Sequence, residues 1–257
     1  MNKKRKILFA TIVILILMIG ATLTYLMSSA APMPEALAAM KSDEKVQITD
    51  ADSIVFAPRN TEADSALIIY PGAKVEPVAY APTARAFAEQ GIKTIIVKMP
   101  FNLAVFGINK GDKVIEQNSD IKKWFIAGHS LGGVMAARYV KNRQDIFDGL
   151  ILWASYPEES SDLSQSTMPI MSIYGRNDGL TLPGKISKTK HLLPESITWV
   201  SIWGGNHSQF GWYGFQKGDD TADITREQQQ KEIVEATMEI IRPNQWQIER
   251  QNTEIGD

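Results

Sequence analysis

The sequence predicts a three-layer α/β fold, in which a mostly parallel β-sheet carries helices on both faces, preceded by one N-terminal transmembrane helix. Two observations predict the sheet and its helices. Short apolar segments that suit buried strands alternate along the chain with amphipathic segments that suit helices. The 257 residues, 44% hydrophobic and 22% charged, are ordinary for one large globular domain. The transmembrane helix is predicted by the first 27 residues, which depart from this average.

A basic segment followed by an apolar one opens the chain. Residues 1–6 read MNKKRK, and residues 7–27 contain no charge. A helix of this length spans the roughly 30 Å hydrocarbon core of a bilayer. No Lys or Arg follows until Lys41, so the positive-inside rule predicts a single-pass signal anchor, with residues 1–6 in the cytoplasm and the rest outside the cell membrane. The alternative is secretion after signal cleavage at the small residues 28–30, but the apolar run exceeds a usual signal-peptide core.

Three further segments follow along the chain. Residues 28–45 are rich in small residues and proline, which predicts a tether with a helical turn near 35–40. One α/β domain is expected over 46–242, and a polar C-terminal tail over 243–257. The domain begins with two alternating segments on either side of residues 50–52, which is a hairpin signal.

The remaining elements alternate between strands and helices. Strands are predicted at 66–70, 93–99, 123–128, 149–155, 169–175 and 197–204, and helices at 76–91, 110–117, 131–140 and 225–242. The last helix is the clearest, because Thr225 and Gln228 fit a capping box and Pro243 is a stop signal.

The segment GHSLG, residues 128–132, matches the pattern G-x-S-x-G. Chance alone gives about 0.1 such matches in a chain of this length. Its position is more informative, because it joins the predicted strand 123–128 directly to the predicted helix 131–140. A sharp strand-to-helix turn needs glycine on either side of the nucleophile, here Gly128 and Gly132. Ser130 is therefore the candidate nucleophile.

A nucleophilic serine needs a base and a carboxylate that orients the base. His207 follows the last predicted strand and is the candidate base, and Asp178 follows the strand 169–175. A plain turn aspartate is the alternative for Asp178. The chain order of Ser130, Asp178 and His207, each after a strand, favours a catalytic triad. A structural or pocket-lining role is expected for His129, and a surface position for His191.

An oxyanion hole is expected from two backbone amides. One is that of Leu131, the residue after the nucleophile, and the other belongs to the loop after strand 66–70, where Ala73 is the candidate. Lys74 is expected to be solvated, with binding of an acidic substrate group as the alternative.

Composition excludes several kinds of site. The chain has no cysteine, which excludes disulfides and thiolate ligands, and its three histidines make a zinc site improbable. Without the four N-terminal cations, 23 Lys and Arg residues face 29 Asp and Glu residues, a formal charge of −6. This balance offers no basic surface for nucleic acid. We expect no metal and no cofactor.

The segments around these residues resemble the α/β-hydrolase superfamily, in its small, lidless, dienelactone-hydrolase-like branch. The resemblance covers residues 35–241 and lies in YPGAKVEPVAYAPTARAFAEQG, VKMPFNLAVF, AGHSLGG, SIYGRNDG and GGNHSQFGWYG. It implies a mainly parallel sheet with nucleophile, acid and base in the order of Ser130, Asp178 and His207. Dienelactone hydrolases use a cysteine nucleophile, so their lactone substrate is not carried over. A shallow, open pocket is expected, with candidate lining residues Met99, Phe101, Asn102, Phe106, Gln209, Phe210 and Trp212.

The sequence thus predicts a membrane-anchored, extracytoplasmic serine hydrolase that acts on a small-molecule ester or related acyl substrate. Two alternatives remain open. One is an acyltransferase that acts on a cell-envelope acceptor with the same residues. The other is a non-catalytic binding module, because a fold alone does not establish activity.

Overall fold

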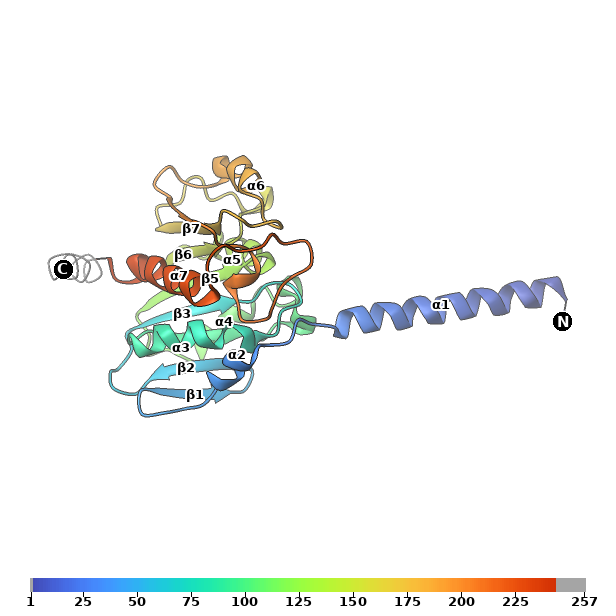
Figure 1. Ribbon diagram of the computed structural model, residues 1–257, viewed down its shortest axis with the longest axis horizontal. Helices are drawn as coiled ribbons and strands as arrows, with labels where there is room; N and C mark the ends of the chain where they lie inside the picture. The colour runs from blue at the N-terminus through green and yellow to red at the C-terminus, as the bar shows by residue number, and fades with distance from the viewer. Residues whose placement is uncertain (1, 244–257) are drawn as a thin grey trace.

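A computed structural model describes residues 2–243 of the chain. Eight strands form one sheet in the order β1-β2-β4-β3-β5-β6-β7-β8 (Figure 1). They are β1 (Val46–Asp50), β2 (Ser53–Pro58), β3 (Ser65–Tyr70), β4 (Lys93–Val97), β5 (Lys123–His129), β6 (Phe147–Trp153), β7 (Ile170–Gly175) and β8 (Thr198–Ile202). β1 and β2 form an antiparallel hairpin at one edge, β2 runs antiparallel to β4, and the other pairs are parallel. The predicted fold class is confirmed.

Seven α-helices accompany the sheet in the described residues. They are α1 (Lys3–Met27), α2 (Pro34–Ala38), α3 (Ala81–Glu89), α4 (Lys110–Glu116), α5 (Leu131–Val140), α6 (Pro183–Lys188) and α7 (Arg226–Ile241). α3 and α7 pack on one face of the sheet, and α4 and α5 pack on the other (Figure 1). α7 begins with the predicted capping box, in which Thr225 and Gln228 bond reciprocally.

The alternation of side chains along β3 divides the core into two layers. All six residues of β3 are buried. Leu67 and Ile69 join the layer under α3 and α7, whereas Ala66 and Ile68 join the layer under α5, because successive residues of a strand point to opposite faces. A strand buried on both faces has no polar face, which explains the continuous apolar run in the sequence.

The parallel strands bring their carboxyl ends to one edge of the sheet. The loops after β3, β5, β7 and β8 lie at this edge, which we call the carboxyl edge. The connection between β6 and β7, residues 154–169, contains one short 3₁₀ helix, Glu159–Ser161. It is too short to form a cap domain over this edge.

Helix α1 stands clear of the rest of the molecule (Figure 1). It is long and apolar enough to cross a membrane, a property that signal sequences share. The segment after it, which the sequence predicts as a tether, packs on the domain. Ala30 pairs in parallel with Val75, the amide of Met33 donates to the carbonyl of Trp212 at 2.8 Å, and Ala36 of α2 is buried. The residues of the predicted tail from 244 onward lie outside the described residues.

Candidate active site

Ser130 lies on a strained turn between β5 and α5. Its φ of 52° and ψ of −124° place it in a backbone conformation that L-residues rarely adopt. The turn is tight: a Cβ atom on Gly128 would lie 2.5 Å from the amide nitrogen of Gly133, and one on Gly132 would lie 2.2 Å from the carbonyl oxygen of Tyr70. Glycine is therefore required at both positions, as the sequence pattern predicts.

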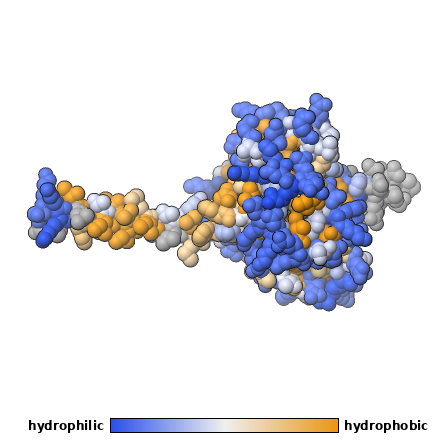
Figure 2. All heavy atoms as spheres, turned by 180° about the vertical axis from the view of Figure 1, so that it is seen from behind, coloured by the Kyte–Doolittle hydropathy of each residue, from blue (hydrophilic) through white to orange (hydrophobic). Residues whose placement is uncertain are grey.

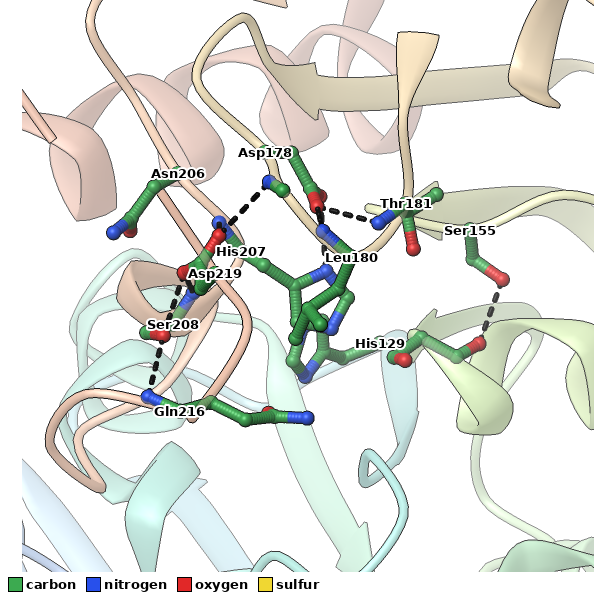
Figure 3. A network of polar contacts seen from close by, with 12 residues as sticks. His129, Ser155, Asp178, Leu180, Thr181, Asn206, His207, Ser208, Gln216 and Asp219 are labelled. Carbon is green, nitrogen blue, oxygen red and sulfur yellow. Dashed lines mark hydrogen bonds and ion pairs between the residues drawn. The ribbon is translucent and has the colours of Figure 1, made fainter. Parts of the chain in front are cut away.

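His207 and Asp178 form a buried pair at the carboxyl edge. Nδ1 of His207 lies 2.9 Å from Oδ2 of Asp178, and the two side chains are 1% and 0% exposed (Figure 3). The other carboxylate oxygen, Oδ1, accepts the amide of Leu180 at 2.9 Å and that of Thr181. Because the carboxylate can only accept, Nδ1 carries the proton and Nε2 of His207 keeps a lone pair. A base in this tautomer can take a proton from a nucleophile.

Ser130 and His207 are neighbours, but they are not hydrogen-bonded. The ring of His129, the residue next to Ser130, lies 4.6 Å from the ring of His207 between centroids. Within residues 2–243, the Ser130 hydroxyl makes no hydrogen bond with His207. Hydrogen bonds of this kind often form only when substrate is present. The structure thus pairs the predicted acid and base directly, and the predicted nucleophile follows His129, whose ring lies against that of His207.

His129 is buried and turned away from solvent. The amide of Gly72 donates to the Tyr80 hydroxyl oxygen at 2.9 Å, and this hydroxyl lies 2.8 Å from Nδ1 of His129. The Tyr80 hydroxyl thus joins the Gly72 amide to the His129 ring. The ring of Phe210 stacks on the other side at 5.6 Å. Burial lowers the pKa of His129 well below its ordinary value, and the neighbouring His207 adds to this effect. His129 is consequently neutral and has no exposed nitrogen to act as a base.

Asp219 holds the loops of the acid and the base together, and the sequence analysis missed it. Its Oδ1 accepts the amides of Gly179 at 3.1 Å and His207 at 3.2 Å, and its Oδ2 accepts the amide and hydroxyl of Ser208 at 2.7 and 2.6 Å. Figure 3 shows this carboxylate beside His207. In the sequence Asp219 belongs to KGDD, which predicts only a turn.

The two predicted oxyanion amides lie on adjoining segments. Leu131 is the first residue of α5, whose first amides have no partner within the helix. The close contact of Gly132 with the carbonyl oxygens of Tyr70 and Pro71 holds this helix start against the loop that contains Ala73. In that loop the amide of Gly72 is bound to Tyr80, whereas that of Ala73 makes no hydrogen bond to another described residue. Both amides are available to a ligand.

Lys74 is not the solvated side chain that the sequence suggests. Its φ is 60°, and its ammonium group donates to the carbonyl oxygens of Leu26 at 2.7 Å and Phe101 at 3.2 Å. It therefore caps a free carbonyl in the last turn of α1.

The other sequence candidates divide between core and surface. Among the expected pocket residues, Met99, Phe210 and Trp212 are buried, whereas Phe101 and Phe106 are exposed. His191 lies on the surface, as expected, and Nε2 of its ring is 3.3 Å from a carboxylate oxygen of Glu159. Residues 2–243 contain no group of three or more His, Asp or Glu side chains that could hold a metal ion.

Comparisons with known proteins identify the family and the fold. The model of a family described as "Alpha/beta hydrolase family" matches residues 66–231. A search of curated protein sequences gave no significant match. Among solved structures, Est1E from Butyrivibrio proteoclasticus is similar with a TM-score of 0.56 and 16% identity, over 77% of this chain and 99% of its own.

Two other solved structures share the fold. A thermophilic esterase, Est2, from Thermogutta terrifontis aligns with a TM-score of 0.51 and 14% identity, over 77% of this chain and 93% of its own. A predicted CIB-like hydrolase from Thermoplasma acidophilum aligns with a TM-score of 0.55 and 13% identity, over 75% of this chain and 96% of its own. At such low identities the likeness concerns the fold alone.

Proposed function

The chain belongs to the alpha/beta hydrolase family, and from this premise we propose that it is a membrane-anchored serine hydrolase that cleaves carboxylic esters. One observation carries the proposal. A buried His207–Asp178 pair, with Nδ1 and Oδ2 2.9 Å apart, lies beside a serine held at a φ of 52°. A purely structural serine needs neither the strained turn nor a buried acid–base pair next to it.

The proposed reaction passes through an acyl-enzyme. Oγ of Ser130 bonds to the ester carbonyl carbon, while Nε2 of His207 takes the hydroxyl proton. The carbon–oxygen bond to the alcohol then breaks, and His207 gives this proton to the departing alkoxide. Water, deprotonated by the same nitrogen, then attacks the acyl carbon. The bond from this carbon to Oγ breaks, His207 returns the proton to Oγ, and the carboxylic acid leaves with Ser130 restored. Asp178 keeps the imidazole in the required tautomer and stabilises its cationic form.

The negative charge that develops on the carbonyl oxygen needs fixed donors. We assign these to the amides of Ala73 and Leu131, which have no other described partner. Donors that are already oriented require no reorganisation during the reaction, and removal of one typically costs roughly 10²- to 10³-fold in rate.

The membrane location is a second part of the proposal. The uncharged helix α1 follows a basic N-terminus, which supports a single-pass anchor with the catalytic domain outside the cytoplasm. Exposed apolar side chains along α1 are costly in water and suited to lipid.

Substitutions in the proposed triad test the function. The full chain should hydrolyse a soluble ester, and Ser130→Ala should reduce kcat by roughly 10⁴-fold or more. Asp178→Asn leaves the geometry but reverses the tautomer of His207, so a loss of roughly 10³- to 10⁴-fold is expected. Ser160→Ala, at an exposed serine, is the matched control and should leave kcat unchanged. Full activity of Ser130→Ala would contradict the proposal.

A further inference from the structure

The membrane helix leads directly to the oxyanion loop. Only residues 28 and 29 separate the end of α1 at Met27 from Ala30, which pairs with Val75. The amide of Ala30 donates to the carbonyl of Lys74 at 2.6 Å, and the amide of Glu76 donates to that of Ala30 at 3.2 Å. A residue spans at most about 3.5 Å. Ala30 therefore lies within roughly 10 Å of Met27, and its hydrogen bonds join it directly to the loop that contains Ala73.

A second contact joins the end of α1 to the loop after β4. The ammonium group of Lys74 bonds to the carbonyl oxygens of both Leu26 and Phe101. The backbone amide of Lys74 also donates to the carbonyl of Asn102 at 2.7 Å. One side chain thus connects the membrane helix with residues 99–107, the loop that lies beside the oxyanion loop.

This loop presents three apolar side chains to the outside. Phe101, Val105 and Phe106 are 52%, 45% and 57% exposed, and the two phenyl rings meet edge to face at 5.9 Å. We call these three residues the membrane-facing patch. Figure 2 shows further apolar atoms where the apolar surface of α1 joins the body of the molecule.

The patch is packed on the helix that follows the candidate nucleophile. The 3₁₀ helix Ala104–Phe106 packs on α5, the helix that Ser130 precedes, and Ala104 is 1% exposed. Phe101 and Asn102 have φ values of 55° and 54°, a backbone conformation that L-residues rarely adopt.

We propose that the membrane-facing patch rests in the headgroup region of the bilayer that α1 crosses, and that the site receives amphiphilic acyl esters held in this bilayer. This inference rests on the proposed function and names its substrate class. The partner is a lipid surface, because the ammonium group of Lys74 ties Phe101 of the patch to Leu26 at the end of the membrane helix. Aromatic side chains are favoured at this depth. The acyl chain of the ester would remain in lipid while its carbonyl reaches Ser130.

Lipid contact can be measured without any assay of activity. The chain has no cysteine, so a single cysteine carries a fluorophore cleanly. Val105→Cys and Ile146→Cys, each in the full chain, are labelled with an NBD group and placed in phosphatidylcholine vesicles that contain doxyl-labelled lipid. Ile146 is 37% exposed but lies just before β6, at the opposite edge of the sheet. Quenching at position 105 should be at least threefold stronger than at position 146, and equal quenching would overturn the proposed contact. A position-105 label that is shielded but not quenched would instead indicate a protein partner.

Kinetics test the substrate class. Phe101→Ser combined with Phe106→Ser is compared with Ile146→Ser on two esters, a long-chain ester dissolved in the vesicles and a short water-soluble one. The double substitution should lower the ratio of kcat/KM for the vesicle ester to kcat/KM for the soluble ester at least tenfold, whereas Ile146→Ser should not. An unchanged ratio would overturn the substrate class. If the unaltered chain cleaves neither ester, the proposed function fails, while the quenching result still decides the membrane contact.

Discussion

His129 illustrates how burial sets the role of a residue next to a nucleophile. Its Nδ1 hydrogen-bonds with the Tyr80 hydroxyl, and its ring stacks on Phe210 and lies 4.6 Å from the His207 ring between centroids. Its Nε2 has no hydrogen-bond partner within the described residues. Protonation of this ring would place an unpaired charge in the core, which makes the stability of the fold sensitive to pH.

Substitution of His129 should reduce this pH dependence. An unfolded histidine has a pKa of about 6.5, and burial lowers the pKa of His129 in the folded state. Between these two values the unfolded chain binds more protons, so stability rises with pH and is lost as pH falls below about 6.5. The difference in the free energy of unfolding between pH 7.5 and 5.5, measured in urea, should be smaller in His129→Asn by about 1 kcal/mol. His191→Asn, at an exposed histidine, is the control, and an equal effect of both would contradict this account.

Asp219 is expected to act as a positioning residue. Asp219→Asn turns one acceptor into a donor that faces the amides of His207 and Ser208, so the loop that carries the base should shift. We expect kcat to fall roughly tenfold or more with a smaller change in KM, and stability to fall by about 1 to 3 kcal/mol. Asp220→Asn alters an exposed neighbour and should change neither kcat nor the free energy of unfolding. A change in stability with no change in kcat would assign Asp219 a purely structural role.

For single residues, the sequence identified those that belong to a recognisable motif and missed those whose role comes from contacts between loops. Ser130, Asp178 and His207 each follow a recognisable strand, and the structure places them at one edge. Asp219 and the capping role of Lys74 depend on which loops meet in space. No local sequence pattern encodes a tertiary contact between distant loops.

The turn between β5 and α5 is the element on which the site depends most. Gly132→Ala would place a Cβ atom 2.2 Å and 2.4 Å from the backbone oxygens of Tyr70 and Pro71, and backbone atoms there cannot yield without moving β3. We expect a loss of stability of roughly 3 kcal/mol or more and a large loss of activity, because the amide of Leu131 moves as well. Thermal unfolding and ester hydrolysis measure the two effects.

Gly184→Ala is the matched control. Gly184 lies in α6, and nothing is within 4 Å of a Cβ atom placed there. Alanine should be neutral or stabilise the helix by about 0.5 to 1 kcal/mol. Equal behaviour of the two variants would contradict the steric account of the turn.

Strands and helices with a clear pattern of apolar residues could be predicted from the sequence, and irregular loops could not. The buried strands and helix α7, with its capping box, follow from apolar runs and from helical spacing. The loop 99–107 contains two short 3₁₀ helices and positive φ values. Besides hydrogen bonds of its own, it bonds to Lys74 of a distant loop, and the sequence of residues 99–107 does not show this contact.

At the scale of the whole molecule, helix α1 is joined directly to the loops at the carboxyl edge of the sheet. The sequence predicts α1 and the α/β domain as separate parts joined by a tether over 28–45. The structure instead packs the start of this segment on the oxyanion loop. Such packing between distant segments has no signature in either segment alone.

Fractionation tests the anchor. The intact chain of 28.6 kDa should remain in the membrane fraction after an alkaline carbonate wash, because an apolar helix in lipid is not released by disrupting ionic contacts. External protease should reach the domain in spheroplasts. A mature protein that begins near Ala31 and is found in the medium would mean that α1 is a cleaved signal peptide.

The central claim is that Ser130 is an activated nucleophile, and covalent labelling tests it most directly. A fluorophosphonate probe reacts with a serine whose proton a nearby base removes. The folded full chain should be labelled at Ser130, as mapped by mass spectrometry of its peptides, and labelling should be lost on denaturation and in Ser130→Ala. Failure of the folded chain to react, or modification of a different serine, would contradict the account.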